Sequence, residues 1–209
     1  MPAQSLSFRH NPLAASRNQL DLLERLTDIP PFGEKLEQEG LGPLQPLALQ
    51  TFQINIGKMC NQVCAHCHVD AGPDRKEIMT RATMQQCLDV LSTLEVKTVD
   101  ITGGAPEMNP DFRWFVSSLR ALGKHVVVRC NLTIIVANKK FYDLPDFYRQ
   151  HRVEVVSSLP FYTADRTDRQ RGEGVFEQSI KALKMLNKVG YGSLDSGLTL
   201  NLVYNPAGA

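Results

Sequence analysis

The sequence has little net charge and no long apolar run. Lys and Arg number 23 and Asp and Glu number 22, which leaves a formal net charge of +1 across 209 residues. Proteins that bind nucleic acids or anionic membranes usually carry a clear basic excess. No apolar segment approaches the roughly 20 residues that span a bilayer, and the N-terminus shows no apolar core of a secretory signal. We therefore expect neither nucleic acid nor a membrane as a partner.

Cysteine is scarce and unevenly placed. There are five cysteines, and three of them lie in one short stretch. A disulfide framework normally uses an even number of cysteines, so this usage favours the reducing cytoplasm. A chain of this length is sufficient for one large domain with an ordinary hydrophobic core.

Strand and helix patterns alternate from Thr51 onward. Short apolar stretches predict five strands, at residues 51–57, 97–104, 125–133, 153–160 and 198–206. Amphipathic segments predict helices, at residues 80–95, 109–123, 143–151 and 174–190, and Asn109 is the expected cap of the second. Such alternation is typical of right-handed βαβ units and a parallel sheet. The fold class is therefore α/β, and we expect the chemistry at the C-terminal strand ends.

The flanks of this series are less regular. Residues 17–26 have helical spacing, and residues 29–47 have the composition of a Pro- and Gly-rich connector. We therefore divide the chain into an N-terminal extension, residues 1–50, and a core, residues 51–209. No helix follows the last predicted strand, which would leave a parallel strand uncovered. We expect the core to be incomplete at its C-terminus.

The most informative stretch follows the first predicted strand. Cys60, Cys64 and Cys67 have the spacing C-x3-C-x2-C, and His66 and His68 flank the third cysteine. A zinc ion could use the three cysteines and one histidine, and Cys64 with Cys67 could form a redox dithiol. Three thiolates could also hold an iron–sulfur cluster with one iron left open for a ligand. The spacing alone leaves these three chemistries open.

The position of this triad resembles the radical SAM superfamily, whose signature is the same spacing after the first strand of a partial (βα)6-type TIM barrel. The resemblance covers the chain from residue 51 to its end. It implies that Cys60, Cys64 and Cys67 bind a [4Fe–4S] cluster whose open iron chelates S-adenosylmethionine (SAM). An electron from a donor such as a flavodoxin or a ferredoxin then splits SAM into methionine and a 5′-deoxyadenosyl radical. His66 takes the place of an aromatic residue that lies near the adenine in the family.

The same resemblance assigns further SAM contacts. Gly103 and Gly104 match a motif whose backbone holds the methionine amino group, and the glutamate of that motif is displaced here to Glu107. Three later positions also match SAM contacts of the family: Ser158 against the cofactor, Arg171 at the SAM carboxylate and Asn201 at the ribose.

The third predicted strand carries polar residues that need partners. Period-two alternation places Arg129 and Asn131 on one face of the strand and Cys130 on the other. Buried polar side chains on a strand require hydrogen bonds, so the pair indicates a wet cavity with Asn131 as a candidate SAM contact. The alternative is a structural pair between Arg129 and Asn131. Cys130 and Cys87 are expected to be inert core residues.

One branch of the superfamily is similar to this chain over four longer strings: CNQVCAHCHVDAGPDRKEIM, TGGAPEMNP, RCNLT and LNLVYNP. It is the radical SAM/Cys-rich branch, which includes the arsenosugar-biosynthesis enzymes. The resemblance implies adenosylation of a methylated trivalent arsenic species and a chain truncated before a cysteine-rich C-terminal domain. A radical SAM enzyme that acts on a peptide or small metabolite is the first alternative. A zinc-stabilised α/β binding module is the non-enzymatic one.

Overall fold

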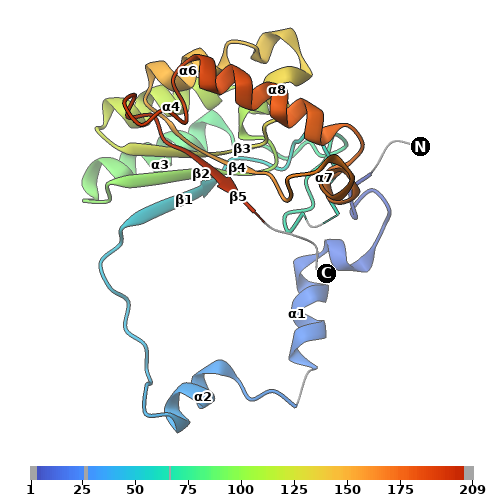
Figure 1. Cartoon of the computed structure of the whole chain (residues 1–209). Helices are drawn as coiled ribbons and strands as arrows, with labels where there is room; N and C mark the ends of the chain where they lie inside the picture. The colour runs from blue at the N-terminus through green and yellow to red at the C-terminus, as the bar shows by residue number, and fades with distance from the viewer. Residues whose placement is uncertain (1–3, 26–27, 66, 205–209) are drawn as a thin grey trace. The chain divides into compact units, whose positions relative to one another are not determined.

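The computed structural model describes residues 4–25, 28–65 and 67–204 (Figure 1). The chain divides into two compact units, Leu6–Leu49 and the remainder. The smaller unit contains one short 3-10 turn and two helices: η1 (Pro12–Ala14), α1 (Ser16–Glu24) and α2 (Phe32–Gln38).

Helix α2 lies within the segment that the sequence predicted to be a connector, so that prediction was wrong there. Pro31 precedes the first helical residue, and a side-chain ion pair joins Lys35 to Glu39 at 2.7 Å, one turn apart. Gly40 adopts a φ of +69° directly after the helix. Proline before the first turn and glycine in the left-handed conformation after the last are favourable helix ends, and here they enclose a helix of two turns.

The larger unit is built on one sheet of five parallel strands, as predicted. The strands are β1 (Thr51–Asn55), β2 (Thr98–Thr102), β3 (His125–Cys130), β4 (Glu154–Ser158) and β5 (Leu200–Val203). They pair in the order β1-β2-β3-β4-β5, so each strand lies beside its neighbour in the sequence. The C-terminal ends of all five strands therefore meet at one edge of the sheet.

Helices cover one face of this sheet (Figure 1): α3 (Arg81–Thr93), α4 (Phe112–Ala121), α6 (Leu144–Gln150) and α8 (Val175–Lys188). A strand order without reversal places every right-handed crossover on the same side. Further elements stand in the remaining connections: η2 (Pro106–Met108), α5 (Ile134–Ala137), η3 (Lys139–Phe141) and α7 (Ala164–Arg171). Neither α5 nor α7 was predicted. No helix in the described part of the chain is long and apolar enough to cross a membrane.

The core lies between these helices and the sheet. Met84, Leu88 and Leu91 of α3 are buried, as their spacing predicted, while Cys87 on the same helix is only half-buried. They pack with the strand residues that point toward the helices, including Val99 and Ile101. The opposite side chains of the strands are thereby free to line a site.

Helix α4 begins later than predicted. Its first residue is Phe112, and Asp111 takes the cap position that was expected for Asn109. The Asn109 side chain is buried and donates to the carbonyls of Ile56 and Met79, both at 3.0 Å. Its Oδ1 accepts from the Asp111 amide at 2.9 Å. Asn109 therefore ties the turn before α4 to the end of the first strand and to the segment before α3.

Candidate functional site

A cavity of about 560 Å³ lies at the C-terminal edge of the sheet. This volume is within the range of small-molecule and cofactor sites, which is roughly 300–1,000 Å³. Most of the predicted site residues line it together: Cys60, Cys64, Cys67, Gly103, Gly104, Asn131, Ser158 and Arg171. Glu107 and Asn201 are not among the lining residues, and His66 lies outside the residues that the structure describes.

Backbone hydrogen bonds shape the loop that carries the three cysteines. Cys60 donates to the Gly72 carbonyl at 3.2 Å, and the Gly72 amide donates to Lys58 at 3.2 Å. These bonds close the loop on itself, so the first cysteine and the residues after the third lie side by side. A further turn joins Cys67 to the Cys64 carbonyl at 3.1 Å. The close sequence spacing of the cysteines therefore becomes a compact loop over the sheet edge.

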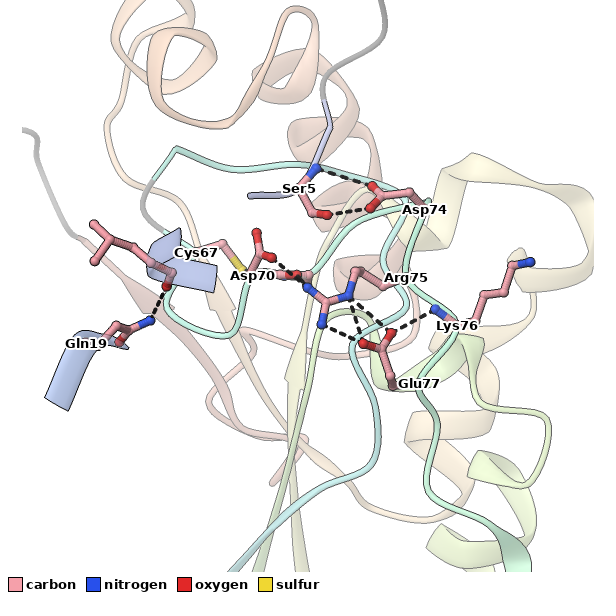
Figure 2. Close-up of polar contacts among 10 residues, drawn as sticks. Ser5, Gln19, Cys67, Asp70, Asp74, Arg75, Lys76 and Glu77 are labelled. Atoms are coloured by element: carbon pink, nitrogen blue, oxygen red, sulfur yellow. Dashed lines mark hydrogen bonds and ion pairs between the residues drawn. The ribbon is translucent and has the colours of Figure 1, made fainter. Parts of the chain in front are cut away.

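The residues after the third cysteine form a charged cluster around one arginine (Figure 2). Arg75 is 9% exposed and forms ion pairs with Asp70 and Glu77, both at 2.6 Å. Ser5 donates its backbone amide to Asp74 in the same segment at 3.3 Å, and its hydroxyl also bonds this carboxylate. The cluster fixes the C-terminal end of the cysteine loop.

The buried environment of two of the cysteines, Cys60 and Cys64, favours their neutral form. Burial raises the pKa of Cys60 to about 11, although the backbone at Gln62 and the side chain of Asn131 act in the opposite direction. Burial also raises the pKa of Cys64, and the positive charge of Arg171 opposes this increase. Metal binding requires thiolates, so loading of this site would release protons.

The arrangement of the thiols is compatible with a cluster. Among the described residues, no three His, Cys, Asp or Glu side chains converge where one metal ion could bind them. Structural zinc needs four ligands around one point. A four-iron cluster binds each thiolate through a different iron, so its ligands need only surround a common space. Cys60, Cys64 and Cys67 line one cavity and satisfy that condition.

The glycine pair is required by contact with the cysteine loop. The Gly104 amide donates to the Gly57 carbonyl at 3.0 Å. A Cβ on Gly104 would lie 2.6 Å from the Met59 carbonyl oxygen and 3.0 Å from the Cβ of Cys60. Gly103 has a φ of +155°, and a Cβ there would lie 2.6 Å from the Gly57 oxygen. The pair therefore seats the cysteine loop against β2 and also lines the cavity.

Arg171 carries a buried donor that faces no acceptor. The residue is 8% exposed, and its Nη2 lies 3.4 Å from Gln62 Oε1 and from Asn131 Oδ1. Its Nε has no hydrogen-bond partner among the residues that the structure describes. An unpaired buried guanidinium nitrogen in a cavity is costly unless a ligand accepts from it. The site therefore fits an anionic ligand group such as a carboxylate.

The neighbouring helices hold Arg171 in place. It is the last residue of α7, and Asp168 on the same helix accepts from the amides of Gly174 and Phe176, both at 2.8 Å. Phe176 lies in the first turn of α8, whose free amides need an acceptor. Helix α7 itself was not predicted from the sequence.

Glu107 and Asn201 lie away from the cavity. Glu107 is 5% exposed, and Tyr148 donates to its Oε1 at 2.5 Å. Burial raises the pKa of Glu107, and burial followed by the neighbouring Glu107 carboxyl raises the pKa of Cys130. Asn201 is exposed on β5 and donates to Glu154 Oε1 at 2.8 Å. A direct SAM contact by Glu107 therefore has no support in this arrangement.

The polar residues of β3 have partners that the sequence did not indicate. Arg129 donates through Nε and Nη2 to Asp100 on β2, with a shortest distance of 2.9 Å. Asp100 is 5% exposed and also accepts from Gln53 at 2.9 Å. The expected alternative, a pair between Arg129 and Asn131, is wrong. Asp100 was missed because it lies in a strand where only the apolar pattern was considered.

Comparison with known proteins identifies the family. A model of the Radical SAM superfamily matches residues 54–205. The chain belongs to the radical SAM superfamily. The family uses a [4Fe–4S] cluster and SAM, which agrees with the predicted cofactors. The thiol triad lies within the matched residues.

Several radical SAM relatives are similar over much of this chain. The mycofactocin maturase MftC of Mycolicibacterium smegmatis is 31% identical over 79% of this chain and 41% of its own length. The subtilosin biosynthesis protein AlbA of Bacillus subtilis is 29% identical over 63% of this chain and 29% of its own length. A probable GTP 3′,8-cyclase of Pyrococcus horikoshii is 26% identical over 66% of this chain and 43% of its own length. The chain therefore spans less than half the length of these relatives.

Solved radical SAM structures share the fold. Streptococcus suis SuiB bound to S-adenosylmethionine matches with a TM-score of 0.57 and 18% identity, over 75% of this chain and 35% of that one. The enzyme anSMEcpe with bound AdoMet matches with a TM-score of 0.59 and 15% identity, over 76% and 43%. The predicted fold class, an α/β partial barrel of the radical SAM kind, is confirmed.

Proposed function

We propose that this chain is the core of a radical SAM enzyme in which Cys60, Cys64 and Cys67 hold a [4Fe–4S] cluster. When bound and reduced, the cluster supplies one electron that breaks the S–C5′ bond of SAM and gives methionine and a 5′-deoxyadenosyl radical. One observation carries the proposal: three cysteine thiols and an unpartnered, buried arginine nitrogen line the same cavity.

The chain's own residues would bind and orient SAM. Arg171 Nε would be available to an acceptor on the ligand, and the methionine carboxylate is the group of SAM with the matching charge. The backbone of Gly103 and Gly104 lines the same cavity and is open to close approach. Ser158, the last residue of β4, also lines this cavity. Together these groups would fix the methionine end of SAM beside the cysteine loop.

Two substrate classes fit different observations. The four strings shared with the radical SAM/Cys-rich branch support adenosylation of a methylated trivalent arsenic species, as in arsenosugar biosynthesis. The relatives named as a mycofactocin maturase and a subtilosin biosynthesis protein support a peptide or small metabolite instead. In either case the electron would come from a donor such as a flavodoxin or a ferredoxin, in the reducing cytoplasm that the cysteine usage favours.

Anaerobic reconstitution with iron and sulfide tests the cofactor proposal. The protein should become brown and bind four irons per chain, with the electron paramagnetic resonance of a reduced cluster after dithionite. Cys60→Ala should lose this signal. Cys87→Ala, which changes a half-buried side chain on α3, should keep it. A colourless protein that holds stoichiometric zinc would instead support the zinc-stabilised binding module.

The substrate classes are separated by product analysis. The reconstituted protein is incubated with dithionite, SAM and either dimethylarsenite or a panel of peptides, and the products are identified by mass spectrometry. An arsenic-containing nucleoside supports the arsenosugar proposal. Formation of 5′-deoxyadenosine with a modified peptide, and no such nucleoside, contradicts it.

A further inference from the structure

All hydrogen-bonding capacity of the Asn131 side chain is used within the protein. A side-chain amide has two N–H donors and an oxygen with two lone pairs. Nδ2 donates to Asn61 Oδ1 at 2.9 Å and to the sulfur of Cys60 at 3.6 Å. Oδ1 accepts from Thr133 Oγ1 at 3.2 Å and from Arg171 Nη2 at 3.4 Å. Asn131 therefore has no free donor or acceptor for a SAM group, although it lines the cavity.

Three of these residues form a closed ring of hydrogen bonds. Asn131 donates to Asn61, Asn61 Nδ2 donates to Thr133 Oγ1 at 2.9 Å, and Thr133 donates back to Asn131 Oδ1. Each group in the ring acts once as donor and once as acceptor, so reversing one amide would break two bonds. The ring therefore fixes which end of the Asn131 amide faces Cys60.

Two of the three ring residues are buried and Asn61 is half-buried, and the ring joins two separate parts of the fold. Asn131 is 6% exposed and Thr133 is 1% exposed, and both follow β3. Asn61 belongs to the cysteine loop, next to Cys60. A buried hydrogen-bond network of this kind is rigid, because opening it leaves polar groups without partners. The N–H that points at Cys60 is therefore held in place by the fold.

We propose that Asn131 is a positioning residue that acts on the cluster through Cys60 and makes its reduction easier. The inference rests on the proposed function, because it needs Cys60 to be a cluster ligand. A hydrogen bond to a ligating sulfur stabilises negative charge, and the reduced cluster carries one more electron than the oxidised cluster. The Asn131 N–H therefore raises the reduction potential, and the Asn61–Thr133 pair keeps this N–H aimed at the sulfur.

The test measures the midpoint potential of the reconstituted cluster without SAM, by redox titration followed with electron paramagnetic resonance. Asn131→Leu removes the donor without adding charge and should shift the potential to a more negative value. Thr133→Val leaves the amide but opens the ring, and should give a smaller shift in the same direction. Thr98→Val makes the same substitution at the other end of β2, outside the cavity lining, and should leave the potential unchanged.

The outcomes separate this inference from the proposed function. A wild-type protein that binds no cluster defeats the proposed function. A wild-type potential in iron-loaded Asn131→Leu overturns the inference alone, and weaker SAM binding with that unchanged potential would make Asn131 a direct SAM contact. If Asn131→Leu does not retain iron, the test rests on Thr133→Val. A wild-type midpoint potential in Thr133→Val then overturns the inference.

Discussion

Arg75 binds Asp70 twice through one nitrogen. Its Nη1 donates to the Asp70 backbone carbonyl at 2.9 Å and to the Asp70 carboxylate at 2.6 Å (Figure 2). Asp70 has a φ of +52°, a conformation that costs energy in a residue other than glycine. Its amide donates to the Cys67 carbonyl at 3.3 Å, and the next amide, of Ala71, donates to the Cys67 sulfur at 3.3 Å. Arg75 therefore stabilises the turn that places an N–H against the third cysteine.

Arg75→Met should destabilise the protein and weaken its hold on iron. The change removes the two hydrogen bonds that Arg75 donates to the Asp70 carbonyl and carboxylate, and hydrogen bonds to charged groups contribute about 2 kcal/mol each. Urea unfolding and the iron content after gel filtration measure the two effects. Lys76→Met, at an exposed neighbouring side chain, is the control and should resemble the wild type. Full stability and full iron retention in Arg75→Met would contradict the role of the turn.

Gly104→Ala should displace the cysteine loop. The new Cβ would lie 2.6 Å from a backbone oxygen of Met59 and 2.9 Å from the Cβ of Ala71, so the loop has to move. Overpacking of this kind costs about 1–3 kcal/mol. Thermal unfolding and iron content are the measurements. Gly33→Ala, where a Cβ meets nothing within 4 Å, should be neutral or slightly stabilising. Normal iron loading in Gly104→Ala would show that the loop tolerates the displacement.

Arg171→Lys should weaken SAM binding by about 10- to 100-fold, because lysine keeps the charge but lacks the fixed fork of donors. Isothermal titration of the reconstituted protein with SAM gives the affinity. Arg169→Lys, on the exposed side of the same helix, should bind SAM like the wild type. Equal affinities for the two variants would exclude Arg171 from the SAM site.

The Glu107→Gln substitution should stabilise the folded protein relative to the wild type increasingly as the pH rises. Burial raises the pKa of Glu107, so above about pH 4.5 the folded protein keeps a proton that the unfolded chain releases. Wild-type stability therefore falls with increasing pH, by at most about 1.4 kcal/mol per pH unit, up to the raised pKa. Glutamine carries no such proton. Urea unfolding at several pH values should show a gap between variant and wild type that widens above pH 4.5.

Exposed Glu173→Gln is the control for that series, and its stability should run parallel to the wild type. If the free energies of unfolding of Glu107→Gln and the wild type differ by the same amount at every pH, Glu107 is ionised in the folded protein.

Local patterns in the sequence were sufficient for the sheet and the thiol triad. Short apolar stretches predicted all five strands of the described sheet, because β1 to β4 bury apolar side chains in the core and β5 keeps the same apolar composition. The spacing of Cys60, Cys64 and Cys67 is likewise a local pattern. Its position after the first strand can be read from the order of residues along the chain. Several of the eight predicted residues that line the cavity, including Gly103, Gly104, Ser158 and Arg171, were assigned by the resemblance to the radical SAM superfamily.

The partners of the polar residues were decided only by the tertiary structure. Glu107 was expected at SAM but lies against Tyr148, because η2 turns its side chain into the helix layer. Asn131 was also expected to contact SAM. The cysteine loop folds back toward it instead, so that Cys60 and Asn61 accept both hydrogen bonds of its amide nitrogen. Periodicity specifies which face of a strand a side chain occupies. The acceptor that it meets depends on loops far away in the sequence, whose course is set by packing.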